Sequence, residues 1–176
     1  ALDEDLLAAL EPTLIVTQAL CPVCAVSYDD VRAIAERLDP QPQVIALDPK
    51  TLGETMGDIR TVSQATKTRD AALELVARQR SRIDKVKVAV RKERRPDVVA
   101  IEWFDPVFVA GHWTPQLIEL AGGTDVLGFA GEPSEQMSWD LLRAAKPEIV
   151  LCIPCGYDAA GSLDQARLFE DELRSL

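Results

Sequence analysis

Short apolar runs alternate with longer segments of helical periodicity along most of the chain. Residues 13–17 and 43–47 are continuous apolar runs of strand length, a pattern typical of parallel strands buried on both faces. Between them, residues 26–38 have helical periodicity, with Ser27 or Asp29 as the predicted N-cap. The order of these segments predicts a β-α-β unit.

The longest helical pattern covers residues 67–93. Its apolar positions recur at steps close to three, four and seven: Ala72, Val76, Ile83, Val86 and Val90. At ~1.5 Å per residue such a helix spans about 40 Å, more than a crossover within one small domain requires. We therefore predict a helix that connects two bodies, while a bent or broken pair of helices stays open as the alternative.

The alternation restarts after Pro96. The predicted elements are a strand at 97–102, a loop at 103–112, a helix at 114–121, a short strand at 125–127, a helix from near Ser138, a strand at 148–152 and a helix from Ser162. The pattern predicts an α/β fold of two lobes with parallel sheets. Residues 1–66 form the N-terminal lobe, residues 67–94 the connecting helix and residues 95–176 the C-terminal lobe.

Charge and hydropathy restrict the functional classes. The 19 basic and 29 acidic residues give a net charge of −10, which disfavours nucleic acid as a partner. No apolar run approaches the roughly 20 residues of a transmembrane helix. Residues 78–95 nevertheless carry +7 and the remainder −17. This basic stretch indicates a solvated helix face or, as the alternative, a specific anion site.

Four cysteines form two Cys-x-x-Cys pairs, Cys21 with Cys24 and Cys152 with Cys155. Disulfides, a metal site and plain packing all stay open for them. Cys152 lies inside an apolar strand and is predicted to be a buried, inert thiol. A zinc site would combine Cys21, Cys24, His112 and Cys155, and a thiol-redox protein would use Cys21 and Cys24.

The loops that follow the predicted strands hold the unusual side chains. They contain or adjoin two of the three tryptophans, the only histidine and all four cysteines. Aromatic side chains at the carboxyl ends of strands suit a flat, largely apolar ligand. Alternatively, Trp103 and Phe104 close the end of the core, and His112 bonds to backbone. Because no phosphate loop or nucleophile elbow is present, we predict a protein that is not an enzyme.

Several motifs resemble a known family. They are EWFDPVFVAGHW at 102–113, LIELAGG at 117–123, KPEIVL at 146–151 and PCGY at 154–157, with EPTLIVTQ at 11–18 and CPVCAVSY at 21–28. In their order they resemble the cobalamin-binding branch of ABC-transporter periplasmic substrate-binding proteins, also described as class III or helical-backbone metal-receptor proteins. The resemblance extends over essentially the whole chain.

The resemblance implies two Rossmann-like lobes bridged by one long helix, with cobalamin or a related corrinoid held between them as a ligand and no catalytic cofactor. One wall of that site would be formed by Gln18, Leu20, Cys21 and Cys24. The opposite wall would be formed by Trp103, Phe104, His112, Trp113, Ser134, Cys155 and Tyr157. Asp5 and Asp140 would dock on arginines of an ABC permease, in the periplasm or another extracytoplasmic compartment.

This chain also departs from the family pattern. Family members have a further β-α portion before the position of Ala1 and more chain after Leu176, so we expect a partial chain with an incomplete N-terminal lobe. No signal peptide is visible. Gln18 stands where some relatives have an aromatic residue. A haem- or siderophore-binding protein and a zinc-binding protein remain alternatives, with a thiol-redox protein as the third.

Overall fold

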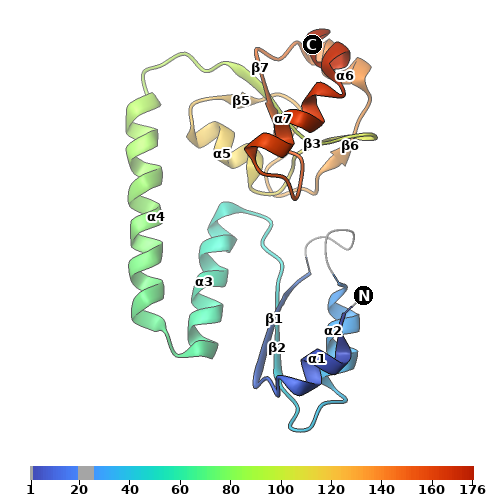
Figure 1. Ribbon diagram of the computed structural model, residues 1–176. Helices are drawn as coiled ribbons and strands as arrows, with labels where there is room; N and C mark the ends of the chain where they lie inside the picture. Colours follow the sequence, from blue (N-terminus) through green and yellow to red (C-terminus); the bar gives the residue numbers. More distant parts are fainter. Residues whose placement is uncertain (1, 20–25) are drawn as a thin grey trace. The chain divides into compact units, whose positions relative to one another are not determined.

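A computed structural model of the chain describes residues 2–19 and 26–176. It divides into two compact units, and each is α/β (Figure 1). The first comprises the chain up to Pro49 together with Gly53–Val76, and the second comprises Lys50–Leu52 with Ala77–Leu176. The lobe boundaries predicted at residues 66 and 94 stay a prediction.

The first unit is built on a two-stranded parallel sheet of β1 (Leu14–Gln18) and β2 (Gln43–Leu47). The apolar face of α2 (Tyr28–Ala35) packs against both strands, and its buried residues are Val31, Ile34 and Ala35. Ser27 caps this helix by accepting a hydrogen bond from the Asp30 N–H (3.1 Å). The β-α-β unit and one of its two predicted N-caps are therefore confirmed.

Three further helices complete this part of the chain: α1 (Glu4–Ala9), α3 (Leu52–Thr66) and α4 (Arg69–Val90). The 22 residues of α4 form one continuous helix, as the long apolar stripe predicted, rather than a broken pair. The helix continues from the first unit into the second after Val76. None of the helices within residues 2–19 and 26–176 combines the length and apolarity that a bilayer crossing requires.

The second unit contains a five-stranded mixed sheet whose central strand is β3 (Asp97–Phe104). Two strands run parallel to it, β5 (Thr124–Asp125) and β7 (Ile149–Cys152). The antiparallel β4 (Val107–Val109) pairs with β3 and carries β6 (Glu135–Gln136) on its other side. The predicted α/β class is confirmed, although this sheet is mixed and not purely parallel.

The loop predicted at residues 103–112 is wrong over its first part, where the chain forms a β-hairpin. Trp103 pairs with Phe108, and Phe104 pairs with Val107. Val107 and Val109 are buried, whereas Phe108 between them is half-buried. This alternation stabilises the short return strand, since every second side chain enters the core.

The two faces of β3 bury different side chains. Val98 and Ala100 pack with Ile118 of α5 (Thr114–Leu120), and Gly122, at φ +90°, follows the end of that helix. The larger cluster on the other face centres on Ile101 and Leu142, the latter from α6 (Trp139–Ala145). It is completed by side chains from α7 (Ala159–Arg167) and α8 (Glu170–Arg174) and the residues next to them.

Candidate functional site

The carboxyl ends of the parallel strands β3 and β7 lie side by side at one edge of the second sheet. Ile101 pairs with Cys152, and the N–H of Ile153 then donates to the carbonyl of Ile101 (2.8 Å). The N–H of Cys155 donates to the carbonyl of Glu102 (3.2 Å). These bonds hold the loop after β7 along the end of β3. In open α/β sheets this edge is where ligands bind.

A pocket of about 580 Å³ lies next to this edge. Its lining is mostly apolar and comes from the end of β7, the following loop and α7: Cys152, Ile153, Pro154, Tyr157, Asp158, Ala159, Ser162, Leu163 and Ala166. Asp158 is the N-cap of α7 and accepts a hydrogen bond from the Gly161 N–H (2.8 Å). We call this cavity the β7 pocket. Its volume falls in the range of small-molecule sites, about 300–1,000 Å³.

Two aromatic side chains at or after the ends of β3 and β7 are exposed. Tyr157, which lines it, is 44% exposed, and Trp103, near the end of β3, is 42% exposed. The indole N–H of Trp103 donates to the carbonyl of Asp105 (3.0 Å). Because this polar group is already bonded internally, the exposed remainder of the indole offers an apolar surface to a ligand.

A second group of predicted residues surrounds a tight turn at His112. This residue has φ +52°, its N–H donates to the Glu132 carbonyl (2.6 Å), and its carbonyl accepts from the Gly131 N–H (2.9 Å). The preceding Gly111 N–H donates to the Ser134 hydroxyl oxygen (3.1 Å). A smaller pocket of about 280 Å³, lined in part by Ser134, adjoins this turn. Trp113 follows, half-buried, at the N-cap of α5.

The structure does not bring these two groups together. Val107 pairs with Phe104 at one end of β4, whereas the Ala110 N–H donates to the Ala100 carbonyl beyond the other end. Trp103 therefore lies toward the hairpin turn, and the residues after Ala110 lie at the opposite end of β4. The two groups lie toward opposite ends of a three-residue strand, and the single wall predicted from sequence stays a prediction.

Phe104, one of the predicted ligand contacts, is buried. Its side chain is 4% exposed and stacks on Phe169, with ring centroids 5.2 Å apart and an interplanar angle of 11°. Phe104 is thus a core residue in this structure, which was the alternative left open by the sequence. Trp103, also considered as a core residue, is instead exposed.

The remaining predicted ligand contacts belong to the first unit. Gln18 is the last residue of β1 and is half-buried. Leu20, Cys21 and Cys24 lie outside the described residues. Their predicted part in a ligand wall stays a prediction.

Two of the four residues of the alternative zinc site, Cys21 and Cys24, lie outside the described residues, so that site stays a prediction. The described residues contain no group of three or more His, Cys, Asp or Glu side chains placed to hold a metal ion. Cys155 is exposed in the loop after β7, while Cys152 is half-buried in the strand. Burial raises the pKa of the Cys152 thiol, as expected for an inert cysteine.

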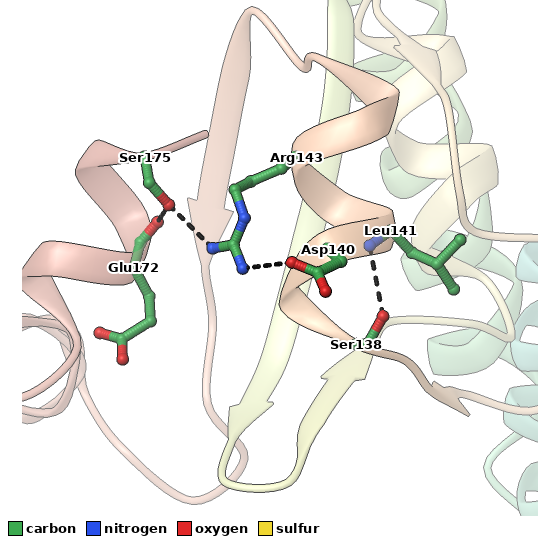
Figure 2. Close-up of polar contacts among 6 residues, drawn as sticks. All are labelled: Ser138, Asp140, Leu141, Arg143, Glu172 and Ser175. Carbon is green, nitrogen blue, oxygen red and sulfur yellow. Dashed lines mark hydrogen bonds and ion pairs between the residues drawn. The ribbon is translucent and has the colours of Figure 1, made fainter.

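The two predicted docking residues both occupy the first turn of a helix. Asp5 is exposed near the start of α1. The side chain of Asp140, in α6, is 89% exposed, and its Oδ1 accepts a 2.6 Å hydrogen bond from Arg143 (Figure 2). Arg143 also donates to the Ser175 hydroxyl (3.0 Å), so it is held from two sides. Ser138, the predicted start of this helix, is confirmed as its N-cap.

Of the nine residues that line the β7 pocket, only Tyr157 was predicted from the sequence as a ligand contact, and Asp158 is among those that were missed. Sequence reasoning placed the start of the last predicted helix at Ser162, whereas α7 begins at Ala159. The signal was present, because Asp158 is a favoured N-cap residue and precedes a helix-forming Ala-Ala pair.

Comparisons with known proteins agree on one fold. The sequence model of the family "Periplasmic binding protein" matches residues 2–173 of this chain. No protein of curated function matches the chain significantly. Similar solved structures include an ABC transporter substrate-binding protein from Listeria monocytogenes EGD-e, at 21% identity and a TM-score of 0.76 over 96% of this chain and 64% of that chain.

Two others are described by their ligands. The periplasmic vitamin B12 binding protein BtuF of Vibrio cholerae has 15% identity and a TM-score of 0.65, over 98% of this chain and 64% of that chain. The S. aureus protein IsdE, complexed with heme, has 17% identity and a TM-score of 0.73, over 99% of this chain and 64% of that chain. The present chain thus spans under two thirds of the length of each, and at these identities the similarity concerns the fold.

Proposed function

Because this chain belongs to the periplasmic binding protein family, we propose that it is a substrate-binding protein that captures cobalamin or a related corrinoid and delivers it to an ABC permease outside the cytoplasm. The family is one of binding proteins and not of enzymes. The ligand, the permease and the compartment of the whole protein are all part of the proposal.

The observation that carries the proposal is the apolar edge formed by β3, β7 and the β7 pocket. Tyr157 in the pocket lining is exposed, as are Trp103 near the end of β3 and Ile153, the first residue after β7. Aromatic rings cover the face of a flat ligand at little cost in conformational entropy. This edge would cover part of one face of a corrin ring.

Haem is the second candidate, favoured by a specific feature of the same pocket. A tyrosine phenolate or a cysteine thiolate can be an axial ligand of haem iron. Tyr157 lines the β7 pocket, and Cys155 is exposed two residues before it. The two candidates differ in what they need from Tyr157, because a corrinoid needs its ring and haem iron needs its hydroxyl.

The test is a titration of the purified chain with cyanocobalamin and, in parallel, with haemin, followed by tryptophan fluorescence and calorimetry. We expect saturable binding of one of them, weakened about tenfold or more by Trp103→Ala or Tyr157→Ala. Tyr157→Phe should keep corrinoid binding and weaken haem binding. Phe129→Ala is the matched control, since Phe129 is 64% exposed but lines the smaller pocket near Ser134. No binding of either ligand, or a loss confined to the Phe129 variant, would refute the proposed site.

Delivery would use Asp140 and, in the first unit, Asp5. Asp140 already accepts a hydrogen bond from Arg143 through Oδ1, so its other carboxylate oxygen can accept from an arginine of the permease. A carboxylate in the first turn of a helix is also stabilised by the helix dipole. Photo-crosslinking residues placed beside these carboxylates, at the exposed positions 6 and 141, should capture a membrane protein from the source organism, and adding Asp140→Lys should abolish capture from position 141. Equal capture from Asp164, exposed in α7, would contradict this docking mode.

A further inference from the structure

The second half of α4 and the residues that follow it carry a concentration of positive charge that the proposed function does not use. Residues 78–95 hold nine basic and two acidic side chains, a net charge of +7 in a chain whose total is −10. Arg94 forms an ion pair with Glu148, and Arg95 donates to the carbonyl of Gly123 (2.5 Å). Within the described residues, the other seven cations have no ion-pair partner.

Three of these cations form one line along the helix. Arg78, Arg82 and Lys85 follow one another at steps of four and three residues and are all exposed; we call them the basic row. Val90 marks the packed side of this half of α4, where its side chain lies against Gly122. At about 100° per residue, the basic row is turned about a third of a revolution away from Val90.

A second row on the same segment provides a comparison. Arg80, Lys87 and Arg91 are also exposed, but Asp84 lies four residues after Arg80 and three before Lys87, so an acidic side chain adjoins this row. Arg82 and Lys85 have no acidic residue three or four positions away in either direction. Arg78 has Glu74 four positions before it, so the positive charge of α4 is least compensated at Arg82 and Lys85.

Internal stability does not account for the basic row. Like charges four residues apart, such as Arg78 and Arg82, destabilise a helix. No hydrogen bond or ion pair within the described residues offsets this repulsion. An external anionic surface would offset it, because each cation then gains a partner and the repulsion along the row is neutralised.

We propose that the basic row binds the surface of an anionic lipid bilayer. Clusters of four to eight Lys and Arg residues recognise anionic lipid headgroups, and the three cations of the basic row belong to a cluster of seven within residues 78–92. Ser81 and Ala89 beside the row are small, so the helix backbone can approach a flat surface. The rest of the chain, at −17, is repelled by that surface, which confines the contact to this helix.

A lipid surface fits the row better than an acidic protein does. Protein interfaces depend on a few large, desolvated anchors, with aromatic residues prominent among them, and α4 contains no aromatic residue. The basic row instead extends its charges over about 10 Å of straight helix. Such an array gives weak, salt-sensitive and reversible attachment.

The experiment is flotation of the purified chain with vesicles of equal parts phosphatidylglycerol and phosphatidylcholine, and with vesicles of phosphatidylcholine alone. We expect binding to the anionic vesicles only, lost when salt is raised from about 0.05 M to about 0.5 M. The triple variant Arg78→Glu, Arg82→Glu, Lys85→Glu should bind about tenfold more weakly or less. Since all three side chains are exposed, circular dichroism should show an unchanged fold.

The matched control reverses the same number of charges on the second row, with Arg80→Glu, Lys87→Glu and Arg91→Glu. This variant should retain binding within about threefold. An equal loss of vesicle binding in both variants would show that binding depends only on the net charge of the chain, and this result would overturn the assignment to the basic row. Equal binding to both vesicle types, or tighter binding to soluble poly-glutamate than to anionic vesicles, would overturn the membrane assignment.

Discussion

Arg94 and Glu148 form a bidentate ion pair that joins the approach to β3 with the approach to β7. The two guanidinium nitrogens of Arg94 donate to the two carboxylate oxygens of Glu148 at 2.7 and 2.6 Å. Glu148 Oε1 also accepts from the N–H of Asp97, the first residue of β3 (3.0 Å). The start of β3 is thereby tied to the residue that precedes β7. The opposite ends of these two strands form the candidate site.

This pair predicts an acid-sensitive contribution to stability. The hydrogen bonds from Arg94, and then the one from Asp97, lower the pKa of Glu148 from 4.5 to about 2. Because the folded-state pKa is depressed, the stabilisation is present above about pH 4.5 and is lost as the pH falls toward 2. Glu148→Gln should unfold at a slightly lower temperature at pH 7 and show less further loss between pH 4.5 and 2. Thermal unfolding measured between pH 7 and pH 2 tests both effects. If the unfolding temperature of Glu148→Gln fell with pH as it does in the unchanged chain, the role of the ion pair would be contradicted.

A close backbone contact at Gly111 predicts that this position tolerates no side chain. A Cβ built there would come within 2.7 Å of the Pro133 carbonyl oxygen, and closer still to the Glu132 carbonyl oxygen. Gly111→Ala should therefore destabilise the chain by about 2 kcal/mol in urea unfolding, because backbone must move. Gly57→Ala in α3 is the control: with nothing within 4 Å of its Cβ, it should stabilise by about 0.5–1 kcal/mol. The opposite order of stabilities would argue against the packing of the His112 turn.

The two cysteines near the β7 pocket should differ in reactivity. Cys155 is exposed, whereas burial raises the pKa of Cys152 and so reduces its thiolate fraction at pH 8. In a Cys21→Ser, Cys24→Ser background, a thiol reagent should label Cys155 at least about tenfold faster than Cys152. Mass spectrometry should assign the fast label to position 155, and Cys155→Ser should abolish it. Fast labelling of Cys152 would show that β7 opens readily.

Substitutions of Phe104, which stacks on Phe169, distinguish a structural role of this residue from a role in ligand binding. Phe104→Leu conserves most of the buried volume and should cost about 1 kcal/mol in unfolding free energy, whereas Phe104→Ala should cost about 3–5 kcal/mol. Affinity for whichever ligand binds should change less than about twofold in the Leu variant, because Phe104 faces the core. A large loss of affinity with normal stability would return Phe104 to the ligand site.

Local signals in the sequence determined several elements correctly. The helical stripe from Ala72 to Val90 predicted α4, and the hydroxyls of Ser27 and Ser138 predicted two N-caps. The apolar run at residues 97–102 predicted the central strand. These features depend on interactions within a few residues, so periodicity and capping chemistry are sufficient to find them.

Only the tertiary structure decided which aromatic residue at the end of β3 is exposed and which is buried. Simple alternation from the buried Ile101 would turn Trp103 inward and Phe104 outward. The pairing with β4 instead shifts register between Ile101 and Trp103, so Phe104 enters the core and Trp103 is exposed. A bulge of this kind re-aims the side chains that follow it. Its position depends on how the return strand at Val107–Val109 pairs with β3, and pairing across a hairpin leaves no trace in the periodicity of either strand alone.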